Sequence, residues 1–305
     1  MTTSQVYFRF FNMQGIIVKA LSGFYYVNCE GTQYECRARG SFRKSGVSPA
    51  VGDRVEFAAT DGSHGIVEKI NQRKNMLSRP MVANIDCLII VSSYSVPAPD
   101  ALMIDRLSAI AVYHDIEPII VFNKCDMGDF SEWAGIYRHA GFKTYVVSAE
   151  TGEGIKELGE AIGNKVCAFA GNSGVGKSSI LNALFGETRI KTGEVSEKLG
   201  RGRHTTRHTE LFANSLGGYI VDTPGFSSVE VSDDYNFKLH LAECFPDFAD
   251  YTDNCRFSSC THTCEKGCGV LDAVEDGEIE RSRHKSYCVL ADELKDLKAW
   301  QKKNK

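Results

Sequence analysis

The chain has 305 residues, of which 43% are hydrophobic and 24% charged, and its formal net charge is −4 at pH 7. This length accommodates two or three domains, each with its own core. No apolar run approaches the roughly 20 residues that span a bilayer, and the first 15 residues show no basic segment followed by an apolar one. These features argue against a membrane or exported protein, and we expect a cytoplasmic protein without membrane contact.

The charge is unevenly distributed along the chain. Residues 1–80 carry 11 Lys and Arg residues against 6 Asp and Glu, whereas residues 81–234 carry 13 against 20. A basic first third on an acidic body indicates either a localised contact with a polyanion or a solvated basic face.

Residues 14–75 predict an all-β domain. Short segments rich in Val, Ile, Tyr and Phe alternate with Gly, Asn and Asp, and no helical pattern interrupts them. Four or five short strands in about 60 residues are typical of a small closed barrel, either OB-like or SH3-like.

From about residue 84, apolar runs that end in polar residues alternate with helical patterns. Residues 86–94 and 117–124 are typical of buried parallel strands. Between them, residues 100–115 have apolar residues at helical spacing after Asp100, a predicted N-cap. Strand and helix patterns continue to about residue 225, which predicts a parallel sheet with helices on both faces.

The loop after the second of these strands holds Asn123, Lys124 and Asp126, the NKxD spelling with which P-loop GTPases read guanine. It ends a predicted strand, at the sheet edge where such folds bind ligands. The Asp126 carboxylate can accept hydrogen bonds from guanine N1–H and the 2-amino group. Asn123 would tie the loop to the phosphate loop, and the Lys124 stem would lie along the base. After the next strand, Ser148 and Ala149 open SAETGEG, which matches a loop that supports guanine binding.

The strongest motif is GNSGVGKS at 171–178, which follows a predicted strand and opens a helix, as a P-loop does. Glycines let backbone N–H groups face phosphates. Lys177 would pair with the β- and γ-phosphates, and Ser178 would bind Mg²⁺. The predicted GTP contacts here are Gly171, Asn172, Ser173, Gly174, Val175, Gly176, Lys177, Ser178 and Ser179. The base-reading motif thus precedes the phosphate loop, which reverses the usual order.

The sequence VDTPG at 221–225, where the next strand ends, supplies two further predicted contacts. Asp222 would hold Mg²⁺ through water, and the Gly225 N–H would meet the γ-phosphate. Residues 200–210 suit a mobile switch loop, in which Thr205 or Thr206 would ligate Mg²⁺.

Phe226 follows DTPG, where many GTPases carry a Gln that orients the attacking water. A phenylalanine cannot do so. His204, beside the switch threonines, is our candidate catalytic residue, because an imidazole can orient water or accept its proton. The alternatives for His204 are an exposed loop histidine or an RNA contact.

A cysteine-rich segment begins at residue 255. Cys255, Cys260, His262 and Cys268 offer three thiolates and an imidazole for a closed, structural Zn²⁺ site. Cys264 is a competing ligand, since the four cysteines of this segment would also form a complete site.

In this order, NKCD, SAETGEG, GNSGVGKSS, GRHTT, DTPGF and C-x4-C-x-H-x5-C resemble the RsgA (YjeQ/YloQ) family of bacterial circularly permuted GTPases. The resemblance implies an N-terminal all-β OB-like barrel (1–78), a circularly permuted α/β P-loop GTPase domain (79–232) and a C-terminal zinc-binding, mainly helical domain (233–305). It also implies a ribosome-dependent GTPase that acts late in assembly of the small ribosomal subunit.

The resemblance further assigns individual residues. It implies a catalytic role for His204, and it puts the zinc ligands on Cys255, Cys260, His262 and Cys268, so that Cys264 is an extra thiol. Arg207 stands where the family commonly has a further threonine, so the magnesium ligand is Thr205 or Thr206, and we favour Thr205.

We therefore predict a GTP hydrolase that binds the small ribosomal subunit and its rRNA, carries one structural Zn²⁺, uses Mg²⁺ with GTP and acts as a monomer. The alternative is a nucleotide-gated rRNA-binding module in which hydrolysis is incidental. A P-loop kinase for a small acceptor is disfavoured by the guanine motifs. Because the permuted chain runs from DTPG almost directly into the zinc domain, we also predict a mechanical link between the γ-phosphate loop and that domain.

Overall fold

The computed structural model describes residues 12–40, 42, 46–60, 62–78, 81–94, 97–186, 209–222 and 235–297. The structural statements below concern these ranges. The predicted site residues His204, Thr205, Thr206 and Gly225 lie outside them.

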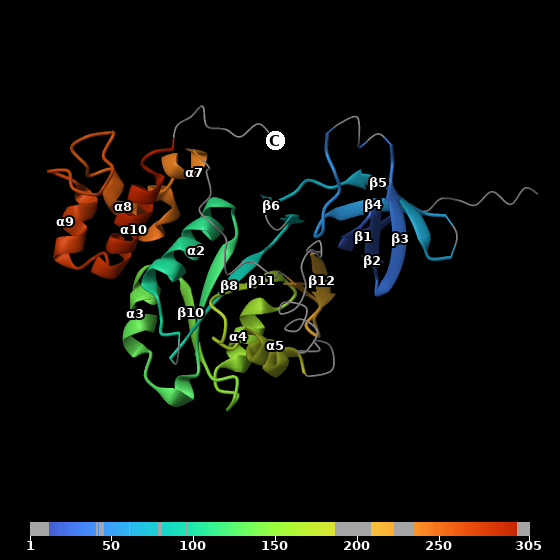
Figure 1. Cartoon of the computed structure of the whole chain (residues 1–305), viewed down its shortest axis with the longest axis horizontal. Coiled ribbons are helices and arrows are strands. Elements are labelled where there is room, and N and C mark those ends of the chain that lie inside the picture. The colour runs from blue at the N-terminus through green and yellow to red at the C-terminus, as the bar shows by residue number, and fades with distance from the viewer. Residues whose placement is uncertain are drawn as a thin grey trace, which may run out of the picture.

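Five N-terminal strands form a closed barrel at one end of the molecule (Figure 1). The strands are β1 (Asn12–Leu21), β2 (Phe24–Cys29), β3 (Thr32–Ala38), β4 (Arg54–Ala59) and β5 (His64–Ile70). They pair in the order β1-β2-β3-β5-β4, and β4 pairs back with β1. Ile17, Val27, Phe57 and Val67 alternate with outward residues and fill the interior. This strand order, with β4 closing on β1, confirms the OB-like barrel.

A second set of strands forms the central sheet. They are β8 (Cys87–Ser93), β9 (Glu117–Asn123), β10 (Lys143–Val147), β11 (Val166–Ala170), β12 (Glu210–Ala213) and β13 (Tyr219–Asp222). Their order is β10-β9-β8-β11-β13-β12, and each neighbouring pair is parallel except β12 with β13. The parallel sheet is therefore confirmed, with one antiparallel strand at its side.

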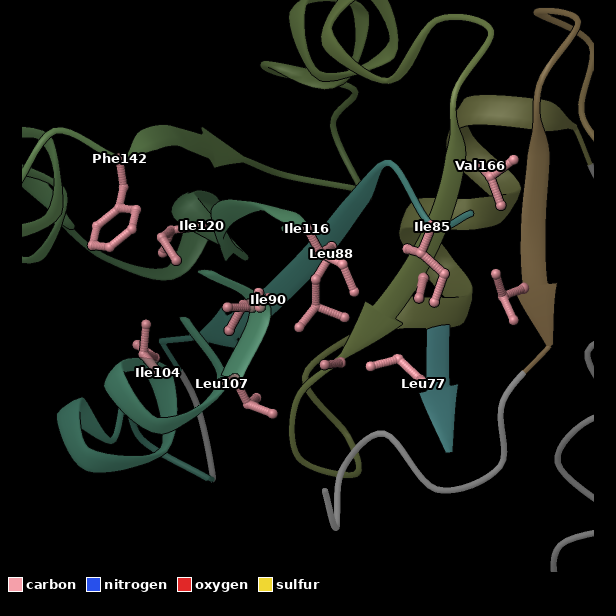
Figure 2. Packing of buried hydrophobic residues seen from close by; sticks show 14 of the residues in the cluster. Leu77, Ile85, Leu88, Ile90, Ile104, Leu107, Ile116, Ile120, Phe142 and Val166 are labelled. Carbon is pink, nitrogen blue, oxygen red and sulfur yellow. The ribbon is translucent and has the colours of Figure 1, made fainter. Parts of the chain in front are cut away.

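Helices cover both faces of this sheet because alternate residues of each buried strand point to opposite sides. α2 (Ala101–Tyr113) and α3 (Ser131–His139) pack on one face, and α4 (Ile155–Ile162) and α5 (Lys177–Phe185) on the other. Figure 2 shows Ile104 and Leu107 of α2 near Leu88 and Ile90 of β8. The predicted N-cap is also present, since Asp100 Oδ1 accepts the Met103 N–H at 3.4 Å.

The barrel is joined to the GTPase sheet through its first strand. Lys19 of β1 pairs with Glu210 of β12, so the two sheets are continuous. The Lys19 ammonium lies 2.9 Å from the Glu210 carboxylate, and the Asn28 amide donates to the Tyr219 hydroxyl at 3.1 Å. A short hairpin of β6 (Met76–Ser78) and β7 (Met81–Ala83) lies between barrel and sheet.

The C-terminal part is mainly helical, as predicted. It consists of α7 (Tyr235–Leu239), η3 (Ala242–Cys244), η4 (Pro246–Phe248), α8 (Ala249–Thr252), α9 (Gly269–Asp276) and α10 (Arg281–Leu294). Its apolar core includes Ala109 and Ile110 of α2, so this domain is packed directly on the GTPase domain. Among the described helices, none combines the length and apolarity of a membrane span.

Candidate nucleotide site and metal centre

Strand register gathers the predicted nucleotide loops at one edge of the sheet. In the ladders, Ser93 of β8 lies opposite Asn123 of β9, and Asn123 lies opposite Val147 of β10. On the other side of β8, Ala170 of β11 lies opposite Ile90. The loops that follow these strands therefore leave the sheet side by side, at the carboxyl edge where α/β folds bind ligands.

The phosphate loop runs from the end of β11 into α5. At two positions in this loop, both the backbone conformation and the lack of room for a Cβ atom require glycine. Gly171 has φ 129° and Gly176 has φ 94°, a region that favours glycine. A Cβ at Gly171 would overlap the Val91 carbonyl oxygen, and one at Gly176 would overlap the Asn123 amide. The loop is therefore fitted closely to the neighbouring strand ends.

Lys177 begins α5 and turns back over this loop. Its ammonium donates to the Gly171 carbonyl at 2.7 Å and to the Asn172 carbonyl at 2.9 Å. Partial burial lowers the pKa of Lys177 because desolvation disfavours the charged form. Ser178 and Ser179 are exposed in the first helical turn. The helix N-terminus, the ammonium and a serine hydroxyl thus face one region, an arrangement that suits phosphate.

The base-reading loop is bonded to both neighbouring loops. The Asn123 amide donates to the Val175 carbonyl of the phosphate loop at 2.9 Å, and its oxygen accepts the Ala149 N–H at 3.1 Å. Asp126 accepts a hydrogen bond from the Ser148 hydroxyl at 2.5 Å. Ser148 is fully buried, whereas Asp126 is exposed and so accessible to a base.

Lys124 also contacts the phosphate loop. It adopts a left-handed conformation with φ 69°, and its ammonium donates to the Gly174 carbonyl at 3.1 Å. The structure therefore brings together all of the predicted residues of the base-reading, supporting and phosphate loops. Asp222 ends β13, which is paired with β11, so its backbone lies beside the strand that leads into the phosphate loop.

The metal centre lies in the C-terminal domain. The ligand atoms of Cys255, Cys260, His262 and Cys268 all lie within 4.8 Å of one another. His262 Nδ1 is 3.5 Å from the sulfurs of both Cys255 and Cys268, and those two sulfurs are 3.9 Å apart. Tetrahedral Zn²⁺ bonded at about 2.3 Å to sulfur and about 2.0 Å to nitrogen spaces its ligand atoms about 3.5–3.8 Å apart. The donor set and its spacing therefore fit Zn²⁺.

Two residues that the sequence reasoning missed hold the ligand loop. The Glu265 carboxylate accepts the N–H groups of Thr261, Thr263 and Cys264. Although burial raises the pKa of Glu265, the hydrogen bonds from Thr261 and the backbone lower it to about 2. His284 Nε2 lies 2.8 Å from the His262 carbonyl oxygen. The sequence THTCE could have indicated the role of Glu265, because a carboxylate next to a tight loop can accept hydrogen bonds from the N–H groups of that loop. The contact of His284 could not be predicted, because only the fold brings α10 to the ligand loop.

The phosphate loop that opens α5, the base-reading loop upstream of it and their shared sheet edge define a circularly permuted P-loop GTPase, an enzyme that hydrolyses GTP. Family models agree, because the model of the RsgA GTPase matches residues 70–232 and that of the RsgA N-terminal domain matches residues 14–67. The chain belongs to the RsgA GTPase family.

Relatives cover nearly the whole chain. A protein of Caldanaerobacter subterraneus subsp. tengcongensis is 44% identical over 295 residues, which cover 96% of this chain and 99% of that protein. A protein of Shouchella clausii is 44% identical over 292 residues, which cover 93% and 98%. Both are named small ribosomal subunit biogenesis GTPase RsgA.

Two solved structures share the architecture. The structure of YloQ, described as a circularly permuted GTPase, is 34% identical, covers 98% of this chain and 99% of its own, and has a TM-score of 0.79. That of YjeQ from Thermotoga maritima is 35% identical, covers 94% and 100%, and has a TM-score of 0.80.

Proposed function

We propose that this GTPase acts in biogenesis of the small ribosomal subunit. The observation that carries the proposal is the bonded network of base-reading and phosphate loops, in a chain that matches relatives of that named role almost from end to end. The subunit and its rRNA are the proposed partners, and the cytoplasm, where such subunits are assembled, is the proposed location. The basic first third of the chain supports contact with a polyanion.

We assign guanine recognition to the base-side loops. Asp126 would accept from the base, held by Ser148, while Asn123 joins the loops and Ala149 lies beside them. The remaining GTP contacts are assigned to Lys124, to Asp222 and Gly225, and to the phosphate-loop residues Gly171, Asn172, Ser173, Gly174, Val175, Gly176, Lys177, Ser178 and Ser179. Ser178 and Thr205 are the proposed Mg²⁺ ligands, and the ion would screen the phosphate charge.

We assign water activation to His204, since Phe226 occupies the position of the usual glutamine. His204 would orient the attacking water or accept its proton. Because the chain lacks that glutamine, we expect slow hydrolysis alone and faster hydrolysis when the subunit fixes the loop.

The zinc ligands Cys255, Cys260, His262 and Cys268 would hold one structural ion, which leaves no position open for water. We also propose that the protein acts as a monomer, since the described base-reading and phosphate loops are bonded to one another within one chain.

The test measures multiple-turnover GTP hydrolysis with and without purified small ribosomal subunits. We expect the subunits to raise the rate, and we expect His204→Ala to lower the stimulated rate by about a hundredfold or more while GTP affinity stays near that of the wild type. If His204→Ala is stimulated normally, the catalytic assignment is wrong. If subunits bind in a GTP-dependent manner without raising the rate, the chain is instead a nucleotide-gated rRNA-binding module.

A further inference from the structure

The turn that carries Asp126 is held on its upstream side by hydrogen bonds and on its downstream side by an aromatic ring. After Lys124, the single turn η1 (Cys125–Met127) forms, with Met127 N–H donating to the Lys124 carbonyl at 3.0 Å. Gly128 ends this turn, donating to the Cys125 carbonyl at 3.4 Å.

Tyr94 covers Gly128. Ser93, the last residue of β8, lies opposite Asn123 in the ladder, so Tyr94 leaves the sheet beside the base-reading loop. A Cβ built at Gly128 would overlap three ring carbons of Tyr94. The backbone of Gly128 is extended, with φ 172°, a conformation open to any residue. Glycine is therefore needed here for the approach of the ring and not for the backbone.

The Tyr94 ring is itself oriented by a stack of aromatic residues. It meets Phe130 edge-on, with centroids 5.6 Å apart and planes at 89°. Phe130 is 1% exposed and stacks on Phe122 at 5.0 Å. Phe122 directly precedes Asn123, and Phe130 is the residue just before α3. The three rings therefore bracket the base-reading loop from its first residue to its last, although Tyr94 itself is 47% exposed.

From this geometry we propose that Tyr94 is a positioning residue for guanine recognition. The ring holds Gly128, which fixes the turn and keeps the Asp126 carboxylate aimed at the N1–H and 2-amino groups of the base. This inference rests on the proposed role of Asp126 in guanine binding. Tyr94 acts through the turn and does not itself touch the nucleotide.

The test measures the affinities of GTP and of inosine triphosphate, which lacks the 2-amino group, for the full chain. Loss of one aromatic contact is expected to weaken GTP binding roughly fivefold in Tyr94→Ala. The same substitution should weaken the binding of inosine triphosphate less, because this nucleotide can make only one of the two hydrogen bonds to Asp126. Tyr94→Phe keeps the ring and should bind like the wild type.

Gly128→Ala provides an independent route to the same result. Its methyl group displaces the ring, so it should weaken GTP binding about as much as Tyr94→Ala, and the double variant should be no weaker than either single one. This arm decides the matter even if Tyr94→Ala does not fold. Met127→Ala, which truncates a 55% exposed side chain of the same turn, is the matched control and should bind GTP normally.

Unchanged GTP affinity in Tyr94→Ala and Gly128→Ala would overturn the inference, as would additive losses or equal losses for the two nucleotides. Asp126→Asn, measured alongside, separates this from failure of the proposed site. If Asp126→Asn keeps GTP affinity, the guanine assignment fails; if it loses affinity while Tyr94→Ala does not, the role of Tyr94 alone is wrong.

Discussion

Arg283 is a fully buried cation that faces two carboxylates. It donates to Asp105 of α2 at 2.6 Å, and to both carboxylate oxygens of Asp247 at 2.6 and 2.8 Å. Asp105 Oδ2 has no hydrogen-bond partner within the described part of the chain. One guanidinium between two carboxylates leaves a buried excess of negative charge, which a proton on Asp105 would relieve.

The stability of the protein should therefore depend on pH through Asp105. Burial, assisted by the charge of Asp247, raises the pKa of Asp105 to about 6 even though Arg283 lowers it. An unfolded aspartate has a pKa of about 3.9, so between these values the folded protein holds a proton that the unfolded chain has lost. The stabilisation is complete below about pH 4 and disappears as pH rises through about 6.

Asp105→Asn removes this titration. Between about pH 5 and pH 7.5 we expect the free energy of unfolding of the wild type to fall relative to that of Asp105→Asn by about 1 kcal/mol. Urea unfolding at several pH values measures it, with the exposed Asp276→Asn as the control. Parallel pH curves for wild type and Asp105→Asn would show that Asp105 titrates normally.

The zinc loop is the element in which the sequence left a choice of ligands. Cys268 is buried and close to His262, whereas Cys264 is exposed and is not among the four clustered ligands. We expect Cys264→Ser to keep about one zinc ion per chain and Cys268→Ser to lose it after dialysis against a chelator, because three ligands no longer close the site. Mass spectrometric metal analysis decides the point. Loss of zinc from Cys264→Ser would instead favour the four-thiolate site.

Elements whose signals are local could be predicted from the sequence. The strand before Asn123 is a continuous apolar run, and the glycines after Ala170 mark a loop between strand and helix. The position of the loops then follows from the direction of the strands, since the loops that follow parallel strands all lie at one edge of the sheet. The sequence alone therefore predicts that the base-reading and phosphate loops belong to one site.

Features that depend on tertiary pairing could not be predicted. The choice between an OB-like and an SH3-like barrel depends on which strand closes on β1, and strand patterns do not contain that pairing. Arg283 lies in a polar helix and looks like a surface residue until α2 brings Asp105 to it. From the sequence, Tyr94 is only the residue that follows a strand, and its contact with Gly128 is seen only in the folded structure.

Across the whole molecule, the C-terminal domain is attached to α2 and α3 of the GTPase domain. Besides the Arg283 cluster, α10 is linked to α2 by the pair Arg106–Glu293 and lies close to α3 through His139 and Glu280. Of these helices, α2 and α3 pack against β9, the strand that ends at Asn123. The predicted link through the γ-phosphate loop would therefore act on a domain that is already anchored to α2 and α3, and residues 223–234 of that link lie outside the described ranges.

We expect the attachment of the C-terminal domain to depend mainly on the buried ion pairs of Arg283 with Asp105 and Asp247. Arg283→Met leaves two buried carboxylates without a cation, which should cost about 3–5 kcal/mol. We expect the C-terminal domain to unfold before the GTPase domain, so that calorimetry shows two transitions and proteases cut after residue 222 at lower concentration. Arg106→Gln, which removes a partly exposed pair between the same helices, should cost less than about 1 kcal/mol and keep one transition. Adding Asp105→Leu and Asp247→Leu to Arg283→Met should restore much of the stability, because the cost arises from the unpaired charges. Equal, small effects of Arg283→Met and Arg106→Gln would mean that apolar packing alone holds the domain.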